Sequence, residues 1–101
     1  MNVSVVLPSF NRARLLPITI PTYFQEDVSE VILVDDCSSD NTAEVVKELQ
    51  TRFPTLRYFR NEVNSKQPYT QNVAISKVQS EYIYFGDDDS VLYPGSIRNL
   101  L

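Results

Sequence analysis

The chain has 101 residues, of which 43% are apolar, and its formal net charge at pH 7 is −4. This size predicts a single domain, residues 1–101, whose packed core provides modest stability. The acidic balance argues against nucleic-acid binding, which a basic patch usually marks. Histidine is absent and Cys37 is the single cysteine, which excludes a histidine base, an internal disulfide and a cysteine-rich zinc site.

The sequence contains no pattern typical of membrane insertion or export. No apolar run approaches the roughly 18 residues that a membrane span requires. The N-terminus also lacks the basic region and apolar stretch of a signal peptide. We therefore expect a cytoplasmic protein without a membrane span.

Four short segments rich in β-branched and aromatic residues predict strands. In chain order they are residues 3–7 (VSVVL), 30–34 (EVILV), 56–60 (LRYFR) and 81–85 (EYIYF). The first two are almost continuously apolar. This pattern is typical of strands that are buried on both faces of a parallel sheet.

Helical patterns lie between these strands. Residues 41–53 predict a helix with Ser39 or Asp40 as its N-cap. The apolar face of this helix has four expected members: Ala43, Val46, Leu49 and Phe53. Residues 68–79 predict a later helix that opens with Pro68, a residue suited to a first helical turn.

The segment between the first two strands contains Pro17 and Pro21, so a helix there must start late, kink or break. Alternation of strands and helices predicts an α/β fold with a Rossmann-like, mostly parallel sheet of about four strands. In such sheets, ligands bind at the carboxyl ends of the strands.

Polar clusters follow three of the four predicted strands: residues 8–12 (PSFNR), 35–40 (DDCSSD) and 86–90 (GDDDS). Parallel strands would bring these clusters to one edge of the sheet. Two of the clusters hold six of the thirteen acidic residues: Asp35, Asp36, Asp40, Asp87, Asp88 and Asp89. A divalent cation would relieve this repulsion. Carboxylate oxygens suit Mg²⁺ or Mn²⁺, which proteins often hold through one or two carboxylates and substrate phosphates.

Each cluster also has a purely structural interpretation. Residues 35–40 could be a loop and a helix cap, and residues 8–12 a turn between strand and helix. Residues 87–89 could be a solvated turn before a helix that begins near Pro94, and Cys37 a small loop residue. Three tyrosines at strand positions are expected to serve packing: Tyr58, Tyr82 and Tyr84. The coincidence of three clusters at one edge favours a functional site.

Four segments in this order resemble the nucleotide-binding half of family 2 glycosyltransferases, which have the GT-A fold. The family's Pro-Ser/Thr-Tyr-Asn-Arg motif corresponds to residues 8–12, and its Val-Asp-Asp-Gly-Ser-x-Asp-x-Thr motif to residues 34–42. Its Asn-x-Gly-x-x-x-Ala-Arg-Asn motif corresponds to residues 64–72. Its Asp-x-Asp signature corresponds to residues 87–89, followed by the usual proline at Pro94. The resemblance covers nearly the whole chain.

The resemblance implies that a sugar is transferred from a nucleotide-diphosphosugar to the hydroxyl of an unidentified sugar, lipid or protein acceptor. By family frequency the donor is a UDP-sugar, the cofactor is Mn²⁺ or Mg²⁺, and the configuration inverts. The implied nucleotide-binding residues are Pro8, Ser9, Phe10, Asn11, Asp35, Asp36, Gln71, Asp87 and Asp88. Asp36 is preferred to Asp35 as the partner of the base. Asp89, with Asp87, is the implied metal ligand at the diphosphate.

The chain departs from the family pattern at four positions. Cys37 and Lys66 replace glycines, Phe10 replaces a tyrosine, and Gln71 replaces an arginine expected near the diphosphate. A left-handed turn is less comfortable at Cys37 than at glycine.

Family members also need a second half of comparable size, which supplies the acceptor site and the catalytic base. We therefore assign no base and expect donor binding without a complete transferase site. An open sheet edge would also allow a homo-oligomer.

Two other functions agree with the sequence. One is a different metal-dependent α/β enzyme that acts on phosphate through an aspartate nucleophile, as receivers do. A receiver would carry its acidic pair after the first strand, where this chain has PSFNR. The other is a non-catalytic module that binds a nucleotide or a partner protein. The departures at Lys66 and Gln71 are compatible with this second alternative.

Overall fold

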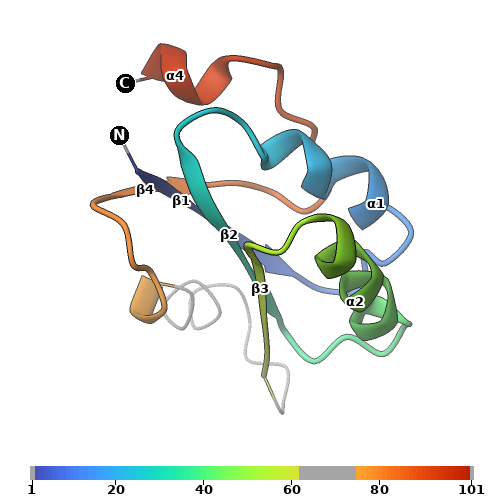
Figure 1. Cartoon of the computed structure of the whole chain (residues 1–101). Coiled ribbons are helices and arrows are strands. Elements are labelled where there is room, and N and C mark those ends of the chain that lie inside the picture. Colours follow the sequence, from blue (N-terminus) through green and yellow to red (C-terminus); the bar gives the residue numbers. More distant parts are fainter. Residues whose placement is uncertain (1, 62–74, 101) are drawn as a thin grey trace.

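The computed structural model of this protein describes residues 2–61 and 75–100 (Figure 1). In these residues, four strands form one sheet in the order β3-β2-β1-β4, and every neighbouring pair is parallel. The strands are β1 (Val3–Ser9), β2 (Val28–Asp35), β3 (Leu56–Arg60) and β4 (Tyr82–Phe85). This architecture confirms the predicted α/β fold with a parallel sheet.

β1 and β2 form the centre of the sheet and are its most deeply buried strands. All seven residues of β1 are buried, as are the last six of β2. β4, an edge strand in the described sheet, has no buried residue. The continuous apolar runs in the sequence therefore identified the central strands correctly.

The connection between β1 and β2 breaks into two short helices, as its two prolines predicted. α1 covers Leu16–Thr19 and continues directly into a 3₁₀ helix, η1, over Ile20–Tyr23. Pro17 and Pro21 each lie in the first two positions of their helix, where no backbone N–H is needed.

The helix predicted between β2 and β3 is α2 (Thr42–Arg52). Val46 and Leu49 are buried as expected, but Ala43 is exposed and Thr42 is buried in its place. The prediction of Ala43 was wrong because positions three and four residues before Val46 both satisfy helical spacing. The apolar character of alanine favoured it over threonine, whose hydroxyl is paired in the structure.

The N-cap of α2 also differs from the prediction. Asn41 is the N-cap and makes no side-chain capping bond. Asp40, one residue earlier, instead accepts hydrogen bonds from the Thr42 N–H at 3.1 Å and from the Thr42 hydroxyl. Asp40 therefore stabilises the helix start from outside the helix.

Two further helical segments were predicted near the end of the chain. Most of the predicted helix at residues 68–79 lies outside the described residues, although Ile75 and Ser76 are helical. α4 covers Ser96–Leu100 and follows Pro94 as expected. No helix in the described part of the chain is long and apolar enough to cross a membrane.

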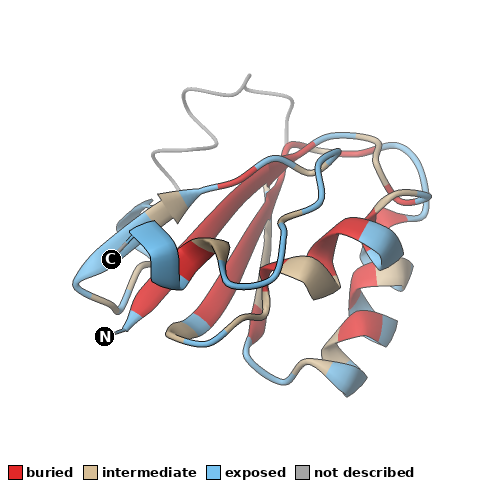
Figure 2. Ribbon diagram, turned by 90° about the horizontal axis from the view of Figure 1, so that it is seen from above, coloured by how far each residue is buried: buried red, intermediate tan, exposed pale blue. Residues whose placement is uncertain are grey.

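The central strands are buried along most of their length (Figure 2). Their side chains belong to two hydrophobic clusters, one on each face of the sheet. The larger cluster joins β1, β2 and β3 to α1, η1 and α2, and its buried members are Val5, Leu7, Leu16, Ile20, Tyr23, Val31, Leu33, Val46, Leu49 and Leu56. A smaller cluster on the other face consists of Val6, Ile32 and Val34. This two-sided burial fixes the central strands and thereby the edge at which they end.

Gly86, directly after β4, is packed too closely for any side chain. Its N–H bonds the Val6 carbonyl at 2.9 Å, which continues the pairing with β1. A Cβ at this position would lie 2.6 Å from Leu7 Cδ2 and 2.6 Å from Tyr23 Cε1. The missing side chain therefore allows the Tyr23 ring to reach the end of β4.

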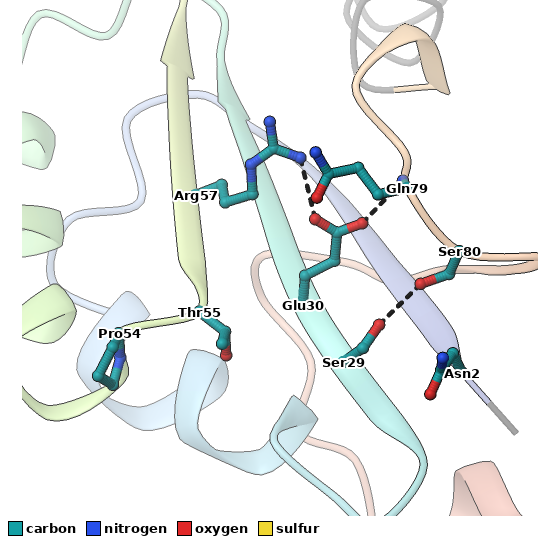
Figure 3. A pocket seen from close by; sticks show the side chains of 8 residues that line it. All are labelled: Asn2, Ser29, Glu30, Pro54, Thr55, Arg57, Gln79 and Ser80. Atoms are coloured by element: carbon teal, nitrogen blue, oxygen red, sulfur yellow. Dashed lines mark hydrogen bonds and ion pairs between the residues drawn. The ribbon is translucent and has the colours of Figure 1, made fainter.

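A buried carboxylate joins the strands at their amino ends (Figure 3). Glu30 accepts hydrogen bonds from Ser4 Oγ at 2.5 Å, Arg57 Nη1 at 2.9 Å and the Gln79 N–H at 2.9 Å. Burial raises the pKa of Glu30, but these hydrogen bonds outweigh burial and leave the pKa below its ordinary value. Glu30 and Arg57 also line a pocket of about 370 Å³.

Replacing Gly86 by alanine should destabilise the protein by about 1–3 kcal/mol, because the new methyl group overpacks the core against Leu7 and Tyr23. Urea denaturation measures this loss. Gly95→Ala is the control, since a Cβ there meets no atom within 4 Å and encounters only the strain of φ +81°. An equal or smaller loss for Gly86→Ala would contradict the packing argument.

Glu30→Gln should lower the free energy of unfolding at pH 7 by about 1–3 kcal/mol, because charge-assisted hydrogen bonds are lost. A lowered carboxyl pKa stabilises the folded state above the unfolded pKa, and this stability disappears as the pH falls through the folded pKa. The difference from wild type should therefore shrink when urea denaturation is repeated near pH 3. Glu48→Gln, at an exposed position of α2, should change little at either pH.

Candidate functional site

The parallel sheet brings the three polar clusters of the sequence to the edge formed by the carboxyl ends of β1, β2 and β4. Ser9 pairs with Asp35 across β1 and β2, while Phe85 pairs with Val6, so residues 86–89 run on beside the end of β1. The Glu30 pocket lies at the opposite ends of the strands. We therefore take the carboxyl edge, rather than this pocket, as the candidate site.

The loop after β1 contacts both acidic segments. On one side, the Asp36 N–H donates to the Ser9 carbonyl at 2.8 Å, and the Asn11 N–H donates to Ser38 Oγ at 2.9 Å. On the other side, the Phe10 N–H approaches Asp88 Oδ2 at 3.4 Å. This loop therefore connects the predicted base-binding and metal-binding regions.

Asn11 also stabilises the loop after β2 with its side chain. Its Oδ1 accepts from the Ser39 N–H at 2.8 Å. Asn11 has φ +52° and Cys37 has φ +61°, both in the left-handed region. The turn that a glycine would favour is thus present at Cys37, despite the unfavourable residue type. The Asn11 hydrogen bonds help to hold this strained conformation.

Asp35 is completely buried and lies at the centre of a hydrogen-bond network. Its Oδ1 accepts from the Ser38 N–H at 2.9 Å and from the Ser38 hydroxyl. Its Oδ2 accepts from the Tyr58 hydroxyl at 2.6 Å and from Arg60 Nη1 at 3.0 Å. Burial is the main reason that the pKa of Tyr58 is raised to about 12, with the Asp35 contact adding to it. The carboxylate of Asp35 therefore connects Ser38, in the loop after β2, to Tyr58 and Arg60 of β3.

Arg60, at the end of β3, supports the same loop from a second direction. Its Nη2 donates to the Ser38 carbonyl at 2.9 Å, while its Nη1 pairs with Asp35. The side chain of Arg60 remains 42% exposed, so the ion pair is only partly shielded from water. The positively charged guanidinium of Arg60 therefore lies beside the loop that carries Asp36.

Asp36, the preferred partner of the base, is 6% exposed. Its Oδ1 accepts from Asn61 Nδ2 at 3.2 Å. Phe10 is 42% exposed on the same edge, whereas Pro8 and Ser9 are buried within β1. Phe10 therefore offers an accessible aromatic side chain one residue after Ser9, whose carbonyl accepts from the Asp36 N–H.

The three consecutive aspartates differ in their surroundings. Asp87 and Asp89 are exposed, whereas the side chain of Asp88 is only 16% exposed and has an ion pair of 3.8 Å with Arg12 Nε. Burial raises the pKa of Asp88, against the lowering effects of Ser9, the Phe10 N–H and Arg12. The middle aspartate is thus held against the loop after β1, while the other two face solvent.

The described residues contain no group of three or more acidic, histidine or cysteine side chains arranged to hold a metal. Asp87 and Asp89 nevertheless provide accessible carboxylate oxygens of the kind that Mg²⁺ and Mn²⁺ prefer. A site with so few protein ligands fits a cation that keeps water and binds substrate phosphates. The residues therefore fit a metal bound together with a phosphate ligand.

Some predicted residues lie outside the described chain, and other important ones were missed. Gln71 and Lys66 belong to the former group. The structure adds Tyr23, Tyr58 and Arg60, which hold the site through the side chain of Asp35 or the backbone of Asp87. Tyr58 was expected only to pack, and Tyr82, expected to pack, is 43% exposed. No short motif marks these long-range contacts.

The parallel sheet, with its polar segments gathered at one edge, defines an α/β protein of the kind in which ligands bind at the carboxyl ends of the strands. The sequence model described as Glycosyl transferase family 2 matches residues 4–101. The chain belongs to this family. It is 34% identical over 102 residues to the GalNAc(5)-diNAcBac-PP-undecaprenol beta-1,3-glucosyltransferase of Campylobacter jejuni. The aligned region covers 98% of this chain and 33% of that relative.

Solved structures share the fold of this chain. The Staphylococcus aureus protein TarS 1-349 in complex with UDP-GlcNAc has a TM-score of 0.87 and 26% identity, over 99% of this chain and 30% of TarS. A Pyrobaculum calidifontis mannosyltransferase in complex with GDP-Man and Mn²⁺ has a TM-score of 0.89 and 23% identity, over 97% and 30% of the two chains. This chain thus spans about a third of the length of these proteins.

The neighbouring residues Asp35 and Asp36 should respond differently to the loss of charge. Asp35→Asn should destabilise the protein by about 1–3 kcal/mol, because a buried acceptor of Tyr58, Arg60 and Ser38 is replaced by an amide. Asp36→Asn is the matched control and should cost less, because Asp35 is the completely buried one of the two and accepts the Tyr58 and Arg60 hydrogen bonds. Thermal and urea unfolding of both variants measure the difference. An equal or larger loss for Asp36→Asn would contradict the supporting role of Asp35.

Proposed function

We propose that residues 1–101 form the donor-binding domain of a glycosyltransferase that uses a nucleotide-diphosphosugar, specifically a UDP-sugar. The observation that carries this proposal is the loop after β1, which contacts both the Asp36 segment and Asp88. One ligand at this edge could therefore reach an aromatic ring, a base-binding carboxylate and the exposed aspartates. Similarity to TarS, solved with UDP-GlcNAc, supports a uridine nucleotide.

Each end of the nucleotide would meet a different part of the edge. We propose that the exposed ring of Phe10 stacks on the base and that the carboxylate of Asp36 accepts its N–H. Pro8, Ser9 and Asn11 form the wall behind them, and Asp35 supports this wall without touching the ligand. The proposal for Asp35 follows from its complete burial and its four donors.

The other end of the donor would lie at the three aspartates. Asp88 is proposed to accept from the ribose hydroxyls, with Asp87 beside it, and Asp89 and Asp87 are proposed to hold Mn²⁺ or Mg²⁺. When bound, such a cation neutralises charge that develops on the leaving nucleoside diphosphate. Gln71 is proposed to lie near the nucleotide, at the position where the resemblance implies an arginine.

The transfer itself requires an acceptor and a base. An acceptor oxygen would bond to the anomeric carbon as the bond from that carbon to the diphosphate breaks, and the base would take the hydroxyl proton. We propose a sugar, lipid or protein acceptor and inversion of configuration. None of the described residues is assigned as the base, so we propose that complete transfer also needs residues corresponding to the remainder of the relatives.

Two proposals concern the setting of the protein. We propose a cytoplasmic location, because the chain has a single cysteine and therefore needs no compartment that forms disulfides. We also propose that the edge of β4 can join a second copy of the chain. Tyr82, Ile83 and Phe85 are all exposed on this strand, which supports such pairing.

Calorimetric titration of the full chain with UDP, with and without Mn²⁺, tests the donor site. We expect binding that strengthens with Mn²⁺ and weakens by about tenfold or more in Asp89→Ala, because a charged ligand to the cation is lost. Glu48→Ala removes an exposed carboxylate from α2 and should bind as wild type. Absence of UDP binding in both conditions would contradict the proposal and favour a partner-binding module.

A further inference from the structure

The side chain of Tyr23 holds the backbone of the acidic segment. Tyr23, the last residue of η1, is 2% exposed. Its hydroxyl donates to the Asp87 carbonyl at 3.0 Å and accepts from the Asp87 N–H at 3.1 Å. A single hydroxyl thus satisfies both backbone groups of the first aspartate.

Two threonines, one in α1 and one in η1, make further hydrogen bonds to the backbone after Asp87. Thr19 Oγ1 donates to the Asp88 carbonyl at 3.1 Å, and Thr22 Oγ1 accepts from the Leu92 N–H at 3.0 Å. All these bonds go to backbone atoms of the acidic segment and its continuation. Asp87 and Asp89 remain exposed, and the Ser90 hydroxyl approaches Asp89 Oδ1 at 3.4 Å.

The packing around Tyr23 makes this arrangement specific. Its ring fills the space beside Gly86, where any side chain would collide with it. The ring also belongs to the main hydrophobic core, so its position is fixed by the sheet and helices. The Tyr23 hydroxyl is consequently held at a fixed place relative to the end of β4. Its two hydrogen bonds hold the backbone of Asp87 at that place.

We propose that Tyr23 is a positioning residue for the donor site, and that its hydroxyl fixes the direction in which Asp87 and Asp89 present their carboxylates to a cation bound with a nucleoside diphosphate. The inference rests on the proposed function. Preorganised ligands bind more tightly because less freedom is lost on binding. The contribution of Tyr23 should therefore appear mainly in the metal-dependent part of nucleotide affinity, since Phe10 and Asp36 lie on the other loops.

Tyr23→Phe tests this inference, because it keeps the ring and removes only the hydroxyl. In calorimetric titrations of the full chain, we expect the affinity for UDP with Mn²⁺ to fall by about tenfold, as for the loss of a hydrogen-bonding group. The affinity without Mn²⁺ should change by less than about threefold. Tyr84→Phe is the matched control, because Tyr84 contacts the same core and its ring lies 6.4 Å from that of Tyr23.

Amide hydrogen exchange gives a readout that does not depend on the ligand. In Tyr23→Phe, amides of residues 87–92 should exchange faster, while those of β2 should keep their protection. If Tyr23→Phe does not fold, Thr19→Val replaces it, because this variant removes the hydroxyl that donates to the Asp88 carbonyl. It should weaken Mn²⁺-dependent binding selectively as well.

The possible outcomes separate this inference from the proposed function. If wild type shows no Mn²⁺-dependent UDP binding, the proposed function fails and the inference fails with it. If wild type binds and Tyr23→Phe binds equally well with Mn²⁺, only the role of Tyr23 is refuted. Equal weakening with and without Mn²⁺ would also refute it, because Tyr23 would then serve general stability. For Thr19→Val, selective weakening with Mn²⁺ would support the positioning of this segment through its backbone, and unchanged binding would contradict it.

Discussion

The parallel pairing of β1 with β2 on one side and β4 on the other determines the rest of this structure. Parallel strands end at the same edge of the sheet, so the segments that follow β1, β2 and β4 meet there although they are far apart in the sequence. No local motif is needed to bring them together. The pairing is maintained by cores on both faces of β1 and β2. A loss of this burial would separate the loop after β1 from both acidic segments at once.

The structure distributes its acidic residues between two different tasks. Asp35 and Glu30 are buried and fully engaged with donors, so they join strands and loops. Asp87 and Asp89 are exposed, and the protein holds this segment through the backbone groups of Asp87 and the carbonyl of Asp88. Placing a charge in the interior costs free energy unless the charge is paired. This cost explains why both buried carboxylates, Asp35 and Glu30, accept several hydrogen bonds. Asp87 and Asp89, the two exposed aspartates, are the residues that we propose hold a cation.

Much of the fold could be predicted from the sequence, because the strands are short apolar runs and α2 has clear helical spacing. The common edge of the polar clusters followed from the same alternation. The supporting contacts could not be predicted. Tyr58 has an ordinary strand position, and its hydroxyl becomes important only when β2 and β3 place it 2.6 Å from Asp35. Tyr23 is separated by 64 residues from the backbone that it bonds.

Paramagnetic broadening of amide resonances by Mn²⁺, measured on the full chain with UDP, would locate the donor site directly. A donor site at the carboxyl edge should give the strongest broadening at Asp89 and its neighbours, with weaker effects at Phe10 and Asp36. Amides of Ser29 and Glu30, at the amino ends of the strands, should stay sharp. Strong broadening around Glu30, with sharp resonances at residues 86–90, would contradict a donor site at the carboxyl edge.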